Sequence, residues 1–183
     1  MKLLYEAILK AVEAEQKAAQ VDPENSMFAT AGLEPPQYVD LYDGQPEIPD
    51  QFEFICPALF IEYAIEWTKT GAVRMGTLTL TVHVLTDAME DTHLINQLPT
   101  GFQKIDYYET VVNMLEGLET AETSGLILTH ERPVTTDYFN YHELTFTCQI
   151  SRKANDIRRY VDGTIEAIPI KGNIKERKTY NIS

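Results

Sequence analysis

The sequence has only two cysteines and no run of apolar residues long enough to cross a membrane. A membrane-spanning helix needs about 18 or more predominantly apolar residues, so we expect none. Cys56 and Cys148 lie far apart in apolar segments, and neither has a second cysteine nearby to form a metal knuckle. This spacing favours free thiols that pack as small hydrophobic groups over the alternative, a disulfide between them.

Basic residues are also scarce, with 15 Lys and Arg against 28 Asp and Glu and a formal net charge of -13 at pH 7. This balance argues against general nucleic-acid binding, because the neutralisation of phosphates requires clustered Lys and Arg. Residues 1–50 carry three basic and ten acidic residues, residues 51–150 carry four and fourteen, and residues 151–183 carry eight and four. An acidic body therefore precedes a basic C-terminal segment, which predicts an acidic partner for that segment.

The sequence lacks the glycine-rich phosphate loops and the G-x-S-x-G nucleophile motif of common enzyme classes. One segment, residues 87–93, has side chains suited to bind Mg, Mn or Zn and to activate a water: Asp87, Glu90, Asp91 and His93. The alternative is a solvated connection in which Asp91 or Thr92 caps a helical turn. We favour this alternative and predict neither an enzyme nor a cofactor.

Three other histidines have no complete catalytic or metal-binding context. His83 is predicted to lie among threonines on the exposed face of a strand. His130 and His142 flank a turn at Pro133, and a site built on these two would lack a third ligand. We interpret both as surface residues.

Residues 2–19 are predicted to form an amphipathic helix, since Leu4, Ile8 and Val12 recur at helical spacing. Charged residues interrupt the apolar run that a signal peptide needs, so we expect a cytosolic product. Residues 21–51 follow as a mostly extended connection with five of the nine prolines. Connections of this length are uncommon in compact domains. We expect it to lie across a surface, either of its own chain or of a neighbour.

Residues 54–87 have the alternation of a β-hairpin with a turn at Gly71, and Thr77, Thr79 and Thr81 share its polar face with His83. Residues 125–134 and 141–151 indicate a second pair of strands. Between the two pairs, residues 102–118 predict a helix whose buried stripe consists of Phe102, Ile105, Tyr108, Val112 and Leu115.

This order of elements predicts an α+β two-layer sandwich, in which an N-terminal and a central helix pack on one face of a mostly antiparallel sheet. We expect one domain over residues 1–151, including the proline-rich connection at 21–51, and a basic C-terminal extension over 152–183. The extension has too little apolar surface to fold independently. Its sequence around residues 164–171 is suited to one further strand.

The element order, with a threonine-rich hairpin face and a last strand that ends in "ELTFTCQIS", resembles the tail terminator and head-to-tail joining proteins of tailed bacteriophages. The resemblance covers roughly residues 1–152. It implies a structural virion protein, made in the host cytoplasm, that forms a hexameric or dodecameric ring between the portal side and the tail. Implied partners are copies of itself, adjacent connector, portal-side or tail-tube proteins, and DNA that passes through the lumen without specific binding; no membrane is implied.

The residues themselves also suit a ring, because a polar sheet face and two irregular arms allow a subunit to overlap its neighbours. Carboxylates that line a lumen would repel DNA phosphates and let the duplex pass. Two alternatives remain, a small metal-dependent hydrolase that uses residues 87–93 and a monomeric binding domain that uses the open sheet face. For the ring, we expect a basic group to dock on acidic surface of the next subunit: Arg152, Lys153, Arg158 and Arg159 on the region of Asp40 and Asp43.

Overall fold

The computed structural model describes residues 1–68, 73–87 and 102–153. Its helices are α1 (Lys2–Val21), α2 (Met27–Thr30) and α3 (Gln103–Leu115), with short 3-10 turns at Pro23–Asn25 and Pro49–Gln51. Its strands are β1 (Tyr38–Leu41), β2 (Ala58–Thr68), β3 (Val73–Thr86), β4 (Ile127–Val134) and β5 (Asn140–Lys153).

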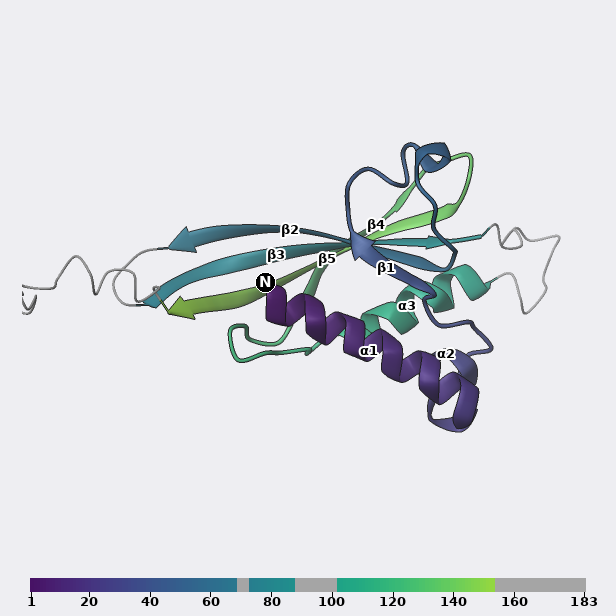
Figure 1. Ribbon diagram of the computed structural model, residues 1–183, viewed down its shortest axis with the longest axis horizontal. Coiled ribbons are helices and arrows are strands. Elements are labelled where there is room, and N and C mark those ends of the chain that lie inside the picture. The colour runs from purple at the N-terminus through teal and green to yellow at the C-terminus, as the bar shows by residue number, and fades with distance from the viewer. Residues whose placement is uncertain (69–72, 88–101, 154–183) are drawn as a thin grey trace, which may run out of the picture.

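These strands form one mixed sheet in the order β1-β2-β3-β5-β4. All neighbouring strands are antiparallel except β1, which runs parallel to β2. The helices lie together on one side of this sheet (Figure 1). The predicted α+β fold with a mostly antiparallel sheet is therefore confirmed, with β1 as an addition that the sequence pattern did not predict.

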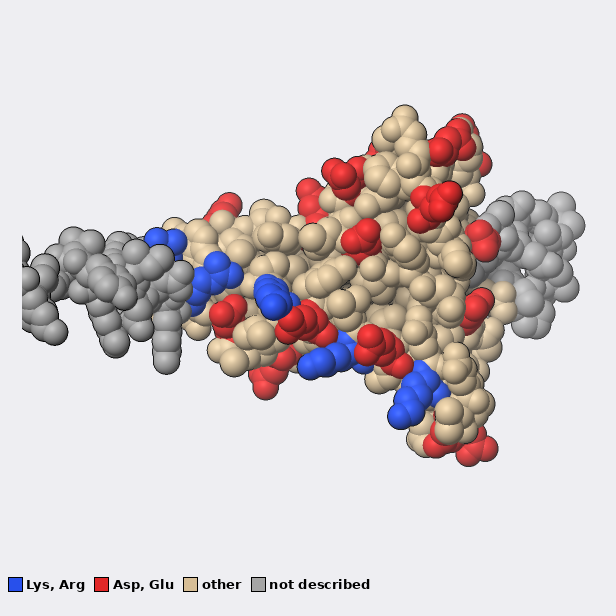
Figure 2. Space-filling view, viewed as in Figure 1, with Lys and Arg blue, Asp and Glu red and all other residues tan. Residues whose placement is uncertain are grey.

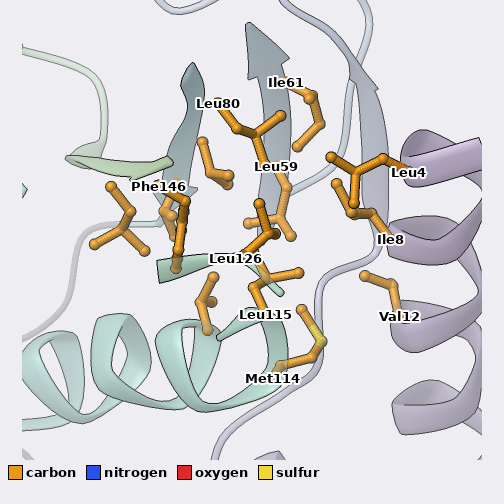
Figure 3. Close-up of a cluster of buried hydrophobic side chains, with 14 of the residues drawn as sticks. Leu4, Ile8, Val12, Leu59, Ile61, Leu80, Met114, Leu115, Leu126 and Phe146 are labelled. Carbon is orange, nitrogen blue, oxygen red and sulfur yellow. The ribbon is translucent and has the colours of Figure 1, made fainter. Parts of the chain in front are cut away.

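The main core lies between the sheet and the helices, and it forms because apolar side chains alternate along the long strands (Figure 3). The predicted stripe of α1 is buried, with Leu4 and Ile8 fully inaccessible to solvent. Each such side chain contributes about 1.5–3 kcal/mol on burial. The sheet supplies the opposite wall of the core: Leu59, Ile61, Leu78, Leu80, Val82, Val84, Leu144, Phe146, Cys148 and Ile150.

The buried face of α3 differs from the predicted one by a rotation of the helix. Phe102 and Ile105 were expected inside but are 57% and 45% exposed. Leu115 is buried as predicted, and Tyr108 and Val112 are half-buried against the core. The buried stripe also contains Tyr107 and Val111, and the Tyr107 ring packs 5.4 Å from the ring of Phe28 in α2. The helix has apolar residues on two adjoining stripes, and contact with a distant segment selects between them.

The proline-rich connection is ordered by pairing and capping rather than by any period of its own. Ser26 caps α2 by accepting a hydrogen bond from Ala29 N at 3.1 Å, and its hydroxyl donates to the Glu15 carboxylate of α1 at 2.9 Å. The same carboxylate accepts from Met27 N at 2.9 Å. These contacts attach the connection to α1, and it then continues into β1 at the sheet edge.

The ends of the three long strands extend beyond the N-terminus of α1 as an arm (Figure 1). We define the arm as residues 63–68 of β2, 73–78 of β3 and 148–153 of β5. Its ladder is unbroken, from Ile65 opposite Leu78 and Cys148 to Val73 opposite Lys153. The predicted turn at Gly71 lies outside the described residues.

Both cysteines are free thiols, as predicted. Cys148 is buried in the main core, and Cys56 is half-buried against a second cluster on the other face of the sheet. Burial raises the pKa of the Cys56 thiol to about 12, with a smaller contribution from the charge of Asp87. This thiol is therefore protonated at neutral pH.

Candidate functional site on the open face of the sheet

The sheet face that points away from the helices has an uncovered half lined by threonines. Thr79 lies opposite Thr147 in the β3–β5 ladder, and Thr81 lies opposite Thr145. These side chains are half-buried, as is Thr77 one step further along the arm. The predicted polar face is therefore present. It extends over two strands, because the threonines of β5 lie beside those of β3 on the same side of the sheet.

The other half of this face is covered by the chain that follows β1. Tyr42 and Phe54 from this segment pack over a second apolar cluster that contains Phe60, Leu85 and Tyr141. The segment thus lies across its own chain, which was one of the two expected locations.

This cover overturns the predicted exposure of His83. The side chain is only 3% exposed, because the Tyr42 ring stacks on the imidazole with their centroids 4.0 Å apart. The strand pattern placed His83 on the correct face, but a segment some forty residues earlier buries it.

His83 is the centre of a polar network. Its Nδ1 lies 2.5 Å from the Tyr141 hydroxyl, and its Nε2 lies 3.4 Å from a carboxylate oxygen of Glu62. The Tyr141 hydroxyl also donates to Glu143 at 3.4 Å, and the Arg132 guanidinium donates to Glu143 at 2.5 Å. The network and the Tyr42 ring hold the covering segment and the neighbouring strands together. Both ring nitrogens of His83 face groups of the protein itself, so neither is free for a substrate.

Burial sets the charge state of this network. Burial lowers the pKa of His83 below its ordinary value, although the carboxylates of Glu143 and Glu62 act in the opposite direction. Burial alone would raise the pKa of Glu143, but the hydrogen bond and charge of Arg132 bring it below its usual value. At neutral pH a neutral imidazole therefore lies beside the ionised carboxylate of Glu143.

We expect the protein to lose stability as the pH falls below the ordinary histidine value of 6.5. In this range the unfolded state binds more protons than the native state, because the native pKa of His83 is lowered, so the free energy of unfolding decreases with pH. Glu143 contributes a separate loss only below its ordinary pKa of 4.5, since its native pKa is also lowered. Unfolding midpoints measured from pH 7.5 to 5 check this expectation.

His83→Gln should reduce the slope of that pH dependence, whereas His130→Gln, at an exposed position on β4, should leave it unchanged. Some slope should persist in His83→Gln, because burial also lowers the pKa of His142. An identical slope in all three proteins would contradict the role of His83.

The predicted acidic segment is only partly described. Asp87 is exposed after β3, whereas Glu90, Asp91 and His93 lie outside the described residues. Within residues 1–68, 73–87 and 102–153, no three or more His, Cys, Asp or Glu side chains are grouped to hold a metal ion. The metal-dependent alternative therefore stays a prediction.

His130 and His142 do not form a pair. His130 lies opposite Thr145, a residue of the open face, whereas the His142 ring stacks on Tyr108 of α3 at 4.2 Å on the helix side. His130 is at the surface as predicted, but His142 is half-buried. A two-histidine metal site is excluded by their positions on opposite faces.

A hollow of about 420 Å³ adjoins His142, and its lining includes Lys104 and Tyr108. Both ring nitrogens of His142 are buried and without a hydrogen-bond partner among the described residues. Asn140 also lines the hollow and donates to the carbonyl oxygen of Asp87 at 2.7 Å, so the end of β3 lies beside it. We assign no ligand to this hollow.

The acidic residues of the predicted interface lie at the wide end of the sheet. Asp40 is half-buried in β1 and accepts hydrogen bonds from Leu41 N at 2.7 Å and from the Tyr38 hydroxyl at 3.3 Å. Asp43 follows β1 and is exposed. Residues 18–68 contain ten Asp and Glu and no Lys or Arg. Figure 2 shows acidic side chains gathered over this end of the molecule.

The basic residues of the predicted interface belong to the arm. Arg152 is exposed, with its guanidinium 5.8 Å from the centroid of the Trp67 ring, and Lys153 ends β5 opposite Val73. Arg158 and Arg159 lie outside the described residues. Asp40 pairs with Phe60, and the eight residues from there to the end of β2 at Thr68 span roughly 26 Å at about 3.3 Å per residue. Asp40 and Arg152 therefore lie too far apart to pair within one chain.

The sequence matches no protein-family model and no curated protein. No helix in the described parts of the chain is long and apolar enough to span a bilayer. The functional conclusion therefore depends on the geometry and charge of the described surface.

Proposed function

We propose that this protein is a structural subunit that binds copies of itself head to tail and closes a ring, as in the neck or at the head-proximal tail end of a tailed bacteriophage. The observation that carries this proposal is the separation of charge along the sheet. Asp40 and Asp43 are at one end and Arg152 and Lys153 at the other, so their attraction acts between copies. A contact between two different surfaces of the same subunit repeats around a closed ring.

The uncovered threonine face supports the same proposal. Threonine side chains on a half-buried face combine methyl groups with hydroxyls that donate and accept hydrogen bonds. Glu62 and Glu66 flank this face on β2, so it is polar without being basic. Such a surface fits a protein neighbour better than an apolar ligand or a nucleic acid.

The acidic side chains of residues 1–150 suit the proposed ring to the passage of DNA. Carboxylates around a lumen repel DNA phosphates, so the duplex passes without adhering. The proposed partners are further copies of the chain and the connector, portal-side or tail-tube proteins above and below, and the proposed location is the virion. Neither the threonine face nor the His83 network offers a reactive group to a substrate, which favours a structural role.

Self-association of the full-length protein tests the proposal. We expect size-exclusion chromatography with light scattering, and electron micrographs, to show closed hexameric or dodecameric rings. Arg152→Glu and Asp43→Lys should each weaken assembly about tenfold, because each replaces an attraction with a repulsion. Combining them should restore assembly, since the charges are exchanged. Raised salt should reduce the effect of each single variant.

Lys10→Glu is the matched control, because it makes the same change of charge at an exposed position on α1 away from the arm. It should assemble like the unmodified protein. A monomer at every concentration and salt would overturn the ring. Rings that resist all the substitutions would overturn the pairing of Arg152 with Asp43, and a Mn- or Zn-dependent rise in the melting temperature that His93→Ala removes would favour the hydrolase alternative.

A further inference from the structure

In the part of the chain that the structure describes, the backbone groups on the outer edge of β2 are unpaired over most of the strand. β1 pairs only with residues 58–61, and the last hydrogen bond on this edge runs from Tyr42 N to the Ile61 carbonyl oxygen at 3.0 Å. Alternate residues of a strand point their backbone groups to the same side. The N–H and C=O groups of Tyr63, Ile65 and Trp67 therefore point outward, and no residue in the described ranges pairs with them.

This edge carries the charges of Glu62 and Glu66 but lacks the bulge and the proline that protect the opposite edge of the sheet. β4 has a bulge between Leu128 and His130, a charged Arg132 and a proline at position 133. Such features prevent an edge strand from pairing with another chain. Residues 62–68 contain no proline, and their register with β3 is continuous. The edge is therefore suited to accept one more strand.

The edge also exposes large apolar side chains on the helix side of the sheet. Tyr63 and Trp67 are 46% and 39% exposed, and Ile65 lies half-buried between them. The Trp67 ring lies against Gly76, since a Cβ added at Gly76 would be 3.1 Å from a carbon atom of that ring. A strand that pairs with this edge would therefore cover part of this exposed apolar surface.

We propose that residues 165–171 of the same chain add to this edge, antiparallel to residues 62–68 of β2. β5 ends at Lys153 opposite Val73, at the tip of the arm, and residues 154–164 remain as a connection. The path across β3 and β2 to a new strand covers three strand spacings, about 14 Å. Eleven residues extend up to about 36 Å, so the connection is long enough. The short tether favours this partner over a segment of another copy, because it gives a high effective concentration.

The proline in this segment determines its alignment. Pro169 has no N–H, so its nitrogen must point away from β2. The backbone groups of Glu166, Ile168 and Ile170 then face the outward groups of Trp67, Ile65 and Tyr63, respectively.

Directly opposite residues share a face, so Ile168 and Ile170 fall beside Ile65 and Tyr63. The same alignment places Lys171 opposite Glu62, where their charges attract. The added strand thus places isoleucines beside Ile65 and Tyr63, Glu166 beside Trp67, and a base beside the acid at Glu62. This inference is independent of the proposed ring.

Two proline substitutions in the full-length protein test the alignment. Ile168→Pro removes an N–H that pairs with β2, whereas Ala167→Pro removes one that points away, so only the first should release the strand. Trp67 is the only tryptophan, and its fluorescence therefore reports on this edge. Ile168→Pro should increase acrylamide quenching about twofold, and Ala167→Pro should leave quenching unchanged. Equal quenching in both variants would overturn the proposal.

A disulfide identifies which copy supplies the strand. Glu66 and Ala167 form a pair without hydrogen bonds between them in the proposed alignment, with Cα atoms about 4.5 Å apart, which suits a disulfide. Glu66→Cys with Ala167→Cys should form a bridge within one chain under mild oxidation, located by peptide mass mapping. Thr77→Cys with Ala167→Cys is the control, because Thr77 lies one strand further away. A bridge between two chains, or none, would overturn the proposal.

Discussion

Phe146→Ala is expected to lower the free energy of unfolding by about 3–5 kcal/mol, the usual range for truncation of a buried phenylalanine. Phe146 is fully buried and lies on β5 between β3 and β4. The cavity left behind would adjoin Leu80, its direct neighbour on β3, and rigid strands on both sides would limit its collapse. Urea unfolding followed by circular dichroism measures the change.

Thr147→Ala is the matched control, since the next residue of the same strand points to the open face and is half-buried. It should lower the free energy of unfolding by about 1 kcal/mol or less. Domains of this size are stable by about 5–15 kcal/mol, so the loss at Phe146 would be a large fraction of the total. Similar losses in the two variants would contradict the assignment of the core to the helix side.

Glu15→Ala is expected to lower the free energy of unfolding by about 2–3 kcal/mol. Glu15 is 9% exposed, and its carboxylate accepts hydrogen bonds from the Ser26 hydroxyl and Met27 N. Its removal would leave both donors without their charged acceptor at the start of α2, and hydrogen bonds to charged groups contribute about 1.5–3 kcal/mol. Thermal or urea unfolding measures the loss, and limited proteolysis should show earlier cleavage within residues 21–37.

Glu13→Ala provides the comparison, because this carboxylate lies on the same helix and is exposed. It should change stability by less than about 0.5 kcal/mol. Glu15→Gln should fall between the two, since an amide oxygen accepts the same hydrogen bonds without the charge. A loss at Glu13 equal to that at Glu15 would show that the Ser26 and Met27 contacts are unimportant.

The elements that the sequence predicts correctly are those whose period is repeated within one segment. α1 repeats its apolar stripe at Leu4, Ile8 and Val12, and all three are buried. The long strands alternate over many residues, so the face that each side chain shares with its neighbours is correct, although Tyr63 and Trp67 on the inner face of β2 are exposed. β1 has only four residues and gains its hydrogen bonds from β2, so its own pattern contains no comparable signal.

The errors at α3 and His83 have a common cause. Each side chain was assigned to the inside or outside from its own element, but contact with a distant segment determines its burial. Phe28 selects the buried face of α3, and Tyr42 covers His83. The alternation also places Glu62 and Glu143 on the same face as His83, yet the network was missed because strand order and register are properties of the whole sheet.

By itself, the sequence determined the α+β class, the faces of the long strands and the uneven distribution of charge, because each depends on residue type and short-range periodicity. Only the tertiary structure decided that Asp40 and Arg152 lie at opposite ends of one sheet, that His83 is buried, and that β2 beyond Ile61 has no partner on its outer edge among residues 1–68, 73–87 and 102–153. The physical reason is that these properties arise from strand pairing across dozens of residues, and the energies of such pairing depend on every strand in the sheet at once.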